Sequence, residues 1–366
     1  MKWISWLHLS DLHSGMEEQE CLWPNFREKF YQDLKKIHRQ SGPWDIILFT
    51  GDLTQRGSGK EFYGTGQSSL NFKLEGLLKK ISDLNSSPIL IAVPGNHDLV
   101  RPDSSLAGVV ALGFWHQKKR IQKLFWKDKK NEYRQTVEKA FRPYSTWVRK
   151  WRKEHPLPSN FVFRKGSLPG DFSLSIEKNG YRLGIVGLNS AFLHLTKESP
   201  YKKLDLNLRQ LHVACNGDPP RWVKRHHAAF LMTHHPPHWL NPKALKNFKA
   251  EIAFSDRRFL IHFFGHMHQS RLTTLTVAGS KVQREWQGTS LFGLENFGNS
   301  TQKRIHGYSA GRIKILNEDK RKAEIRIWPR ILKKLVNEEW GIVPEVELDL
   351  EENNSISDTF ILEKIE

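Results

Sequence analysis

Five short polar motifs, each placed directly after an apolar run, constrain the fold of this chain more than any other feature. The clearest follows residues 88–94 (PILIAVP), a run with the length and β-branched content of a buried strand. There Gly95 permits a sharp turn, and an amide, an imidazole and a carboxylate come next. A single motif of this kind is usually an ordinary loop. In chain order the five are Asp11-x-His13, Gly51-Asp52, Gly95-Asn96-His97-Asp98, His234-His235-Pro236 and Gly265-His266-x-His268.

The apolar runs alternate with helical patterns in the first hundred residues. Strands are expected at 3–9, 45–50 and 88–94, and helices at 24–39 and 70–84, where apolar residues recur at helical spacing. Strand and helix in alternation predict an α/β unit, and the carboxyl ends of such strands are where ligands bind. Further strands are expected at 172–176, 181–188, 228–233, 259–264, 271–276, 282–286, 308–316 and 323–328.

The side chains of these motifs suit a metal centre. Asp-x-His and His-x-His place both side chains on one side of an extended segment, so that one ion can bind both. Two carboxylates, one amide oxygen and four imidazoles are enough for two divalent cations if one carboxylate bridges them. Such nitrogen and oxygen ligands suit manganese, iron, zinc or nickel and exclude a thiolate site.

In these five motifs and their order, the sequence resembles the calcineurin-like metallophosphoesterase family, over about residues 1–330. The Asp-Leu-His start and the His-His-Pro-Pro run look most like its bacterial, dinuclear phosphodiesterase branch. The resemblance implies an α+β fold with αββα layers: a two-sheet β-sandwich flanked by helices, with the metal site at the strand ends. It also implies two divalent metal ions, manganese first among the four.

The resemblance further implies a role for each motif residue. His97 would face the substrate and protonate the leaving oxygen or stabilise the transition state, and Asp98 would orient its imidazole. His235 would lie near the substrate or behind the ligands, because the family ligand is the first histidine of the pair. One metal would be held by Asp11, His13 and His268, the other by Asn96, His234 and His266, with Asp52 bridging.

Residues 104–160 interrupt this pattern and are expected to form an inserted helical cap on a domain spanning 1–337. Between positions 115 and 153 there are fourteen Lys or Arg and three acidic residues, interleaved with aromatic side chains. Two interpretations remain open. The aromatic residues pack inward and the basic face meets solvent, or the cap overhangs the site, attracts a polyanion and stacks bases on an exposed tryptophan.

The charge of the chain is uneven. Residues 338–366 hold ten acidic residues and one basic residue, Lys364, and are expected to form an acidic tail or linker that can bind a protein partner. Subtracting them from the totals of 57 basic and 39 acidic residues leaves 56 and 29, a net charge of +27 for residues 1–337. A body this basic indicates an anionic partner, with nucleic acid ahead of an acidic membrane surface, unless the charge serves solubility alone.

Other features indicate the compartment. Cys21 and Cys215 lie far apart without metal-type spacing, which fits a reducing environment rather than a disulfide framework. The first eleven residues contain too short an apolar core for a signal peptide, and no apolar run approaches the length of a membrane span. The sequence therefore predicts a cytoplasmic protein without a membrane segment.

Taken together, the sequence predicts a metal-dependent phosphoesterase that hydrolyses phosphodiester bonds through a hydroxide activated by two metal ions. The basic body favours a nucleic acid or nucleotide substrate. A phosphodiesterase for small cyclic or linear nucleotides, or a phosphomonoesterase, is the alternative. A third hypothesis is non-enzymatic: a nucleic-acid-binding or regulatory module of a bacterial defence system.

Overall fold

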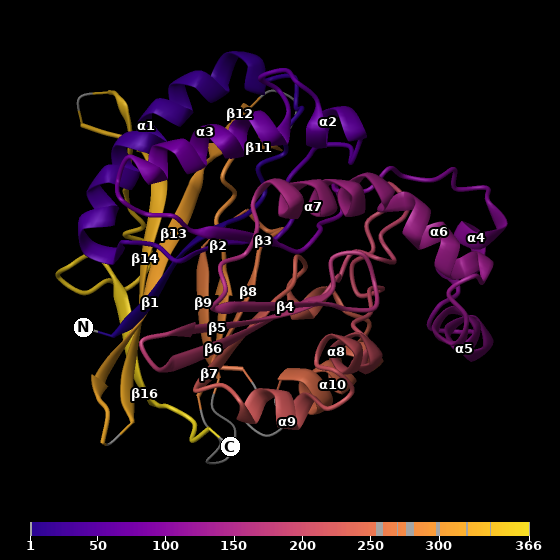
Figure 1. The fold of residues 1–366 in the computed structure, drawn as a ribbon. Helices are drawn as coiled ribbons and strands as arrows, with labels where there is room; N and C mark the ends of the chain where they lie inside the picture. Colours follow the sequence, from indigo (N-terminus) through magenta and orange to yellow (C-terminus); the bar gives the residue numbers. More distant parts are fainter. Residues whose placement is uncertain are drawn as a thin grey trace.

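The fold is that of a computed structural model, which describes residues 2–253, 259–268, 270–275, 282–297, 301–319, 321–336 and 338–365. Two mixed β-sheets stack face to face, and helices cover their outer faces (Figure 1). This is the αββα arrangement expected for the fold, so the predicted fold class is confirmed. None of the helices in these ranges has the length and apolar composition needed to cross a membrane.

The first sheet contains the amino-terminal strands, and β1 lies at its centre. Within the described residues its order is β15-β14-β13-β1-β2-β3, with β16 also paired to β14. β1, β2 and β3 run parallel, whereas β13 is antiparallel to β1. The strands are β1 (Trp3–Leu9), β2 (Ile46–Phe49), β3 (Ile89–Ala92), β13 (Gly307–Asn317), β14 (Lys322–Lys334), β15 (Trp340–Pro344) and β16 (Ile356–Ile361).

The second sheet has the order β4-β5-β6-β7-β8-β10-β9 in the described part of the chain. The expected hairpin around Asn179-Gly180 forms from β5 and β6, while β6, β7 and β8 are parallel. Thr276, the expected last residue of β9, lies outside the described residues. The strands are β4 (Phe161–Lys165), β5 (Phe172–Lys178), β6 (Tyr181–Gly187), β7 (Ala228–Met232), β8 (Ile261–Phe264), β9 (Arg271–Leu275) and β10 (Gln283–Gln287); β11 (Gly293–Phe297) and β12 (Thr301–Ile305) form a separate hairpin.

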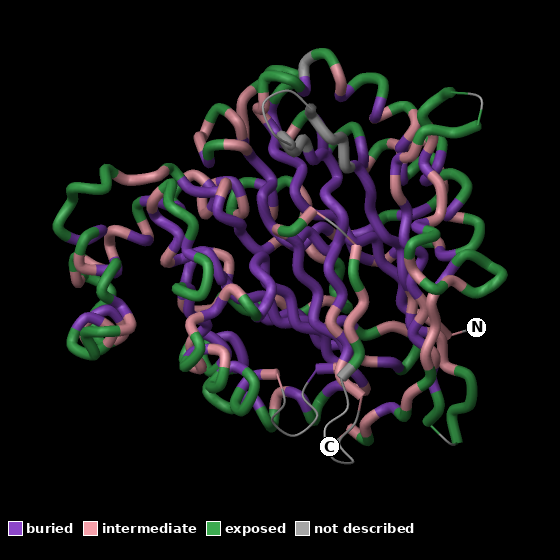
Figure 2. Tube along the Cα trace, turned by 180° about the vertical axis from the view of Figure 1, so that it is seen from behind, coloured by how far each residue is buried: buried purple, intermediate pink, exposed green. Residues whose placement is uncertain are grey.

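Alternation along β1 explains how the sheets pack. Ile4 and Trp6 point toward the second sheet, where the Trp6 ring meets Phe230 of β7 edge to face at 5.0 Å. Leu7 and Leu9 point the other way, into the core beneath the helices. Both faces of β1 are therefore buried, as an apolar central strand requires. Figure 2 shows the central strands almost entirely buried.

Helices complete the outer layers. α1 (Gln19–Ser41) and α3 (Leu70–Ser82) pack on the first sheet, and α8 (Leu208–Ala214) and α10 (Pro242–Asn247) pack on the second (Figure 1). The remaining short elements are α2 (Gly59–Tyr63), α9 (Pro219–Lys224), the 3-10 turn η1 (Pro237–Trp239) and the π-helical turn η2 (Phe248–Ala253).

The inserted cap is helical, with α4 (Ala107–Gly113), α5 (Lys119–Lys127), α6 (Glu132–Ala140) and α7 (Arg142–Glu154). Its four tryptophans are buried or half-buried, so these aromatic residues pack inward and none of them is an exposed stacking surface; attraction of a polyanion by the cap stays a prediction. α7 packs against α2, while the core of α4–α6 includes Ala191, Phe192 and Leu195 of the loop after β6. The cap therefore lies beside that loop, and α4–α6 project from the body (Figure 1).

The acidic carboxyl-terminal segment differs from the expected tail or linker. β15 and β16 both pair with β14 and extend the first sheet. The buried side chains of Ile342 and Leu362 and the Arg284–Asp358 ion pair fix this segment to the body. Its high acidic content hid two short runs, residues 340–344 and 356–361, that hold only one acidic residue between them. A protein partner on this segment stays a prediction.

Candidate metal centre

The polar motifs meet because their strands end at the same edge of each sheet. Parallel strands β1, β2 and β3 deliver three motifs from the first sheet, and β7 and β8 deliver two from the second. Hydrogen bonds close the gaps between the ends: Asp11 donates its N–H to the Gly51 carbonyl at 2.9 Å, and Gly265 donates to the His234 carbonyl at 3.0 Å. The site therefore forms where the two sheets come together.

The backbone at these strand ends adopts an unusual conformation. Five motif residues have φ between 50° and 72°, a region that residues other than glycine rarely occupy. Such conformations persist only where the surrounding structure enforces them, and they cluster at functional sites. The five are Asp11, His13, Asp52, His266 and His268.

At two motif positions a neighbouring segment comes so close to the Cα atom that only glycine fits. A Cβ on Gly95 would lie 2.5 Å from the Asp52 nitrogen, and a Cβ on Gly265 would lie 2.6 Å from Asp11 Oδ2. Both distances are too short for any other residue without movement of the backbone or of the carboxylates. The glycines therefore let the turns of β3 and β8 approach the two aspartates.

One group of side chains gathers around Asp11. Ligand atoms of Asp11, His13 and His268 lie within 4.8 Å of one another, and all three residues are buried or half-buried. His268 Nε2 lies 3.6 Å from Asp11 Oδ1. The three residues expected to hold the first metal are thus brought together.

A second group gathers around His234. Its Nε2 lies 3.1 Å from Asn96 Oδ1, 3.2 Å from His266 Nδ1 and 3.3 Å from Asp52 Oδ2. A carboxylate oxygen of Asp52 also lies within 4.8 Å of the ligand atoms of Asp11 and His234. In a separate group, the same limit joins Asp52 to His13 and His97. Asp52 therefore stands between the two groups, where a bridging ligand would lie.

Several of these buried atoms have no protein partner that would satisfy them. Neither ring nitrogen of His13 has a hydrogen-bond partner among the described residues, and neither does Asp11 Oδ1. Buried polar atoms are almost always paired, so each exception needs a cause. Imidazole nitrogens and carboxylate oxygens that lie close together are suited to bind transition-metal cations. The residues gathered here fit two divalent ions.

Electrostatics at the site favour cations. Burial raises the pKa of Asp52, but the nearby imidazoles of His234 and His97 outweigh it and hold that pKa well below its usual range. In the opposite sense, burial lowers the pKa of His234, yet the charge of Asp52 raises it to about 9. The negative charge of Asp52 favours a proton on His234, and the same charge would favour a metal cation bound at this position.

Two other histidines are held in the neutral form that binds metals. Burial and the neighbouring imidazoles lower the pKa of His266 and of His235 well below its usual value. His266 Nδ1 faces His234 Nε2 in the second group. His235 also lies within reach of both, since its ligand atom falls within 4.8 Å of theirs.

His235 is nevertheless engaged on its other side. Its Nδ1 lies 3.1 Å from Ser190 Oγ and its Nε2 lies 3.4 Å from His194 Nδ1, and the side chain is fully buried. This environment fits a position behind the predicted ligands, and contact of His235 with the substrate stays a prediction. Sequence reasoning missed Ser190 and His194, because nothing in the loop after β6 marks them as neighbours of His235, which follows 45 and 41 residues later.

The contacts of Asp98 differ from what we expected, whereas the role of His97 toward the substrate stays a prediction. The His97 backbone N–H donates to Asp52 Oδ1 at 2.7 Å, and its Nδ1–H donates to the Gln55 carbonyl at 2.8 Å. The Asp98 carboxylate instead accepts from the backbone N–H groups of Leu53, Thr54 and Gly95. Gln55, and not Asp98, orients the His97 ring, while Asp98 ties the turn after β3 to the turn after β2.

A comparison of the sequence with models of protein families identifies the family of this chain. The model of the calcineurin-like phosphoesterase family matches residues 4–270. The chain belongs to this family. The match includes every motif residue described above, and this phosphoesterase chain is therefore a metal-dependent hydrolase by family. No curated protein matches the sequence.

Solved structures similar to this phosphoesterase share little sequence with it. Chaetomium thermophilum Vps29 aligns with 98% of this chain and 99% of its own, at 10% identity and a TM-score of 0.33. The sulfate thiohydrolase SoxB of Thermus thermophilus, solved with glycerol, aligns with 89% of this chain at 13% identity and a TM-score of 0.38. The purple acid phosphatase PPD1 from yellow lupin seeds aligns with 90% at 11% identity and a TM-score of 0.42. This chain covers 56% and 52% of the latter two.

Proposed function

We propose that this protein hydrolyses phosphodiester bonds at a dinuclear metal centre, with a nucleic acid or nucleotide as substrate. The observation that supports this best is the position of Asp52. Its carboxylate lies within 4.8 Å of the ligand atoms of Asp11 and His234 in one group and of His13 in another. A single carboxylate between two sets of buried ligands is suited to bridge two cations.

The chain's own residues would divide between the two ions. Asp11, His13 and His268 would hold one, and Asn96, His234 and His266 would hold the other. Manganese is our first choice, with iron, zinc or nickel as alternatives, since the ligands are nitrogen and oxygen. When bound, two such ions polarise phosphoryl oxygens and lower the pKa of coordinated water.

His97 is the residue we assign to proton transfer. A carbonyl oxygen can only accept, so the hydrogen bond to Gln55 fixes the ring proton on Nδ1 and leaves Nε2 for the substrate. The ring lies edge to face against His13, with 4.8 Å between their centroids. From this position a protonated Nε2 would donate to the leaving oxygen as its bond to phosphorus breaks.

The charge of the body supports an anionic diester of larger size. Residues 1–337 hold 27 more basic than acidic residues, an excess that attracts phosphate chains over long distances. A small mononucleotide needs only one or two such contacts. We also propose that the protein is cytoplasmic.

The test is turnover of bis(p-nitrophenyl) phosphate with added Mn²⁺, alongside p-nitrophenyl phosphate and single-stranded and double-stranded nucleic acids. Asp52→Asn should lower diester turnover by at least about 100-fold, because it removes the charge shared by both ions. Asp349→Asn, an exposed residue far along the chain, is the matched control and should retain full activity.

Each outcome separates the hypotheses. Hydrolysis of reporter and nucleic acid, both lost in Asp52→Asn, would support the proposal. Cleavage of cyclic or linear mononucleotides with intact polynucleotides would favour the small-nucleotide alternative, and a preference for p-nitrophenyl phosphate would favour a phosphomonoesterase. Metal binding without turnover of any of these would point to the binding module.

A further inference from the structure

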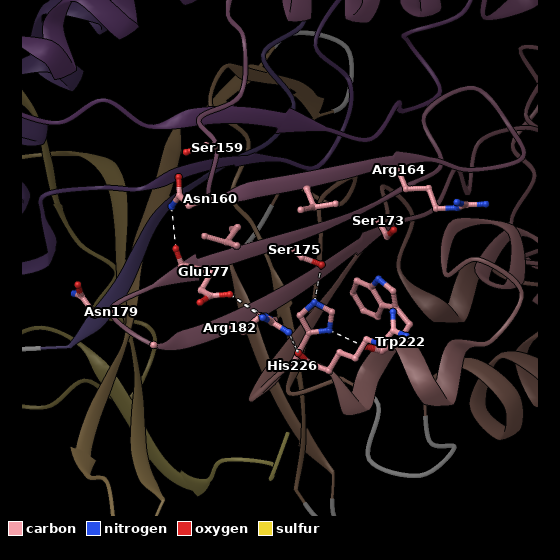
Figure 3. Close-up of a pocket in the computed structure, with 14 residues that line it drawn as sticks. Ser159, Asn160, Arg164, Ser173, Ser175, Glu177, Asn179, Arg182, Trp222 and His226 are labelled. Atoms are coloured by element: carbon pink, nitrogen blue, oxygen red, sulfur yellow. Dashed lines mark hydrogen bonds and ion pairs between the residues drawn. The ribbon is translucent and has the colours of Figure 1, made fainter. Parts of the chain in front are cut away.

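Two hollows of similar size lie outside the metal centre. One, of about 720 Å³, lies over β5 and β6 beside α9 (Figure 3). Its polar groups are largely engaged within the protein: Arg182 pairs with Glu177 at 2.8 Å, and His226 lies 2.7 Å from Ser175 Oγ. The other hollow, of about 710 Å³, lies between the cap helix α5 and the body helices α8 and α10. We call it the basic groove.

The basic groove presents positive charge from both of its walls. Lys119 and Lys123 come from α5, Arg209 from α8 and Lys243 from α10, and all four are exposed. None of them forms an ion pair with a described residue. The lining also holds two acidic residues: Asp205 is buried and accepts the Trp115 indole N–H at 2.8 Å, whereas Glu251 is exposed, so cations still outnumber the exposed acid. The groove therefore attracts an anion longer than one phosphate.

The groove begins close to the metal centre. Trp239 packs edge to face on His266, with 4.1 Å between the ring centroids. Asn241, only two residues further on, lines the groove and donates its N–H to the Leu204 carbonyl at 2.9 Å. The Cα atoms of these two residues lie at most about 7 Å apart, so the end of the groove at Asn241 lies beside the segment whose Trp239 side chain contacts His266.

An exposed aromatic side chain stands beside this junction. Tyr201 is 47% exposed and packs edge to face on Trp239, with 5.5 Å between the centroids. Lys202 lies over the same tyrosine ring at 5.2 Å. An aromatic ring with a cation beside it is suited to stack an unpaired base and to neutralise its phosphate.

We propose that the basic groove binds a single-stranded nucleic acid, whose backbone runs from the metal centre past Tyr201 to the walls formed by α5 and α10. Lysine and arginine on both walls contact successive phosphates, and the bases remain free to stack. A single strand fits because a duplex keeps its bases inside its own stack. This inference rests on the proposed function and names its substrate class.

The test compares two triple variants that remove the same charge. Lys119→Ala/Lys123→Ala/Lys243→Ala removes three of the four cations of the basic groove, and Arg164→Ala/Lys165→Ala/Arg225→Ala removes three exposed cations in and beside the hollow of Figure 3. Binding of fluorescein-labelled single strands of 2, 6 and 12 nucleotides to the Mn²⁺-loaded protein is followed by anisotropy, and cleavage by gel. The groove variant should weaken binding of the 12-mer by at least about tenfold and flatten its salt dependence.

The same variants should leave turnover of bis(p-nitrophenyl) phosphate unchanged, because the reporter does not reach the groove. Equal losses in both triple variants would overturn the proposal, as would unchanged binding in the groove variant or a loss confined to duplex DNA. Failure of the proposed function would appear differently, as binding of single strands without hydrolysis of any diester by the wild type.

Tyr201→Ala tests the stacking contact separately. It should weaken binding of a 6-mer about tenfold when the strand carries bases and leave an abasic strand of the same length unaffected. An equal effect on both strands would mean that Tyr201 supports the loop and does not stack a base.

Discussion

The carboxylate of Asp52 lies 3.3 Å from Nε2 of His234, although the two residues follow strands of different sheets. Asp52 comes after β2 of the first sheet, and His234 comes after β7 of the second. His234 Nδ1 also donates to the Thr50 carbonyl at 2.8 Å, which fixes the distance between the two strand ends. The packing of the sheets thus decides the geometry of the site.

We expect the loss of His97 to depend on the leaving group. His97→Ala should slow cleavage of a dinucleotide, whose leaving alkoxide needs a proton, by about 100-fold or more. It should slow cleavage of thymidine 5′-(p-nitrophenyl phosphate) only a few-fold, because p-nitrophenolate leaves as a stable anion. The measurement is kcat/KM for both substrates.

Metal content and a distant histidine are the controls for this variant. His97→Ala should keep its bound Mn²⁺, measured by mass spectrometry, and the exposed His212→Gln should behave as the wild type. Equal losses on both substrates would show that His97 does not protonate the leaving oxygen.

Asp98 should act on structure and metal affinity. Its carboxylate accepts backbone N–H groups from Leu53, Thr54 and Gly95, so Asp98→Ala leaves three buried donors unpaired. We expect a loss of about 1–3 kcal/mol in the free energy of unfolding and about 10–100-fold weaker metal binding. Urea denaturation and metal titration measure the two. A leaving-group dependence like that of His97→Ala at full metal occupancy would instead mean that Asp98 controls the His97 ring.

His226 should make the protein less stable in mild acid. Burial lowers the pKa of His226 to about 4, against about 6.5 in an unfolded chain. Below pH 6.5 the unfolded chain therefore binds a proton that the folded protein does not. The free energy of unfolding should fall as the pH drops from about 6.5 to about 4, with this residue contributing on the order of 2 kcal/mol.

Urea denaturation across this range, with a chelator present so that metal release does not contribute, measures the effect. His226→Gln does not titrate and should show a shallower fall than the wild type. Parallel curves for the two proteins would mean that His226 is protonated equally in both states.

Breaking the buried contact of Asp33 should destabilise the fold strongly. Asp33, on α1, accepts the Tyr308 hydroxyl at 2.7 Å and Arg330 Nε at 2.8 Å. Asp33→Ala leaves the guanidinium without its charge partner and should lower the free energy of unfolding by about 3–5 kcal/mol. Glu318→Ala breaks the exposed Lys2–Glu318 pair and should cost less than about 1 kcal/mol. Similar losses in the two variants would contradict this assignment.

The parts of the fold that sequence patterns predicted are local ones. An apolar run such as residues 88–94 identifies a strand by itself, and a polar motif after it identifies a strand end. The order of the motifs then indicated the family, which the family comparison confirms. The ligand assignments stay predictions, although Asp11, His13 and His268 do lie together.

The contacts that sequence patterns missed join distant segments. Nothing near Asp33 indicates a partner 297 residues away in Arg330. The hydrogen bond between His97 and Gln55 depends on how two turns approach each other, which no local spacing reports. The strands β15 and β16 were missed because the acidic residues around them were weighed as net charge, although the two strands themselves hold only one acidic residue, Asp358.

The place of β1 between β2 and β13 also sets the order in which the protein can fold during synthesis. Trp3 pairs with Lys314, and the turn that holds Asp11 is closed by N–H groups of Leu291 and Phe292. These partners leave the ribosome some 280 residues after Asp11, so this predicted ligand gains its final backbone conformation late. We therefore expect a nascent chain to carry its amino-terminal motifs without an assembled site until the last strands of the first sheet have joined.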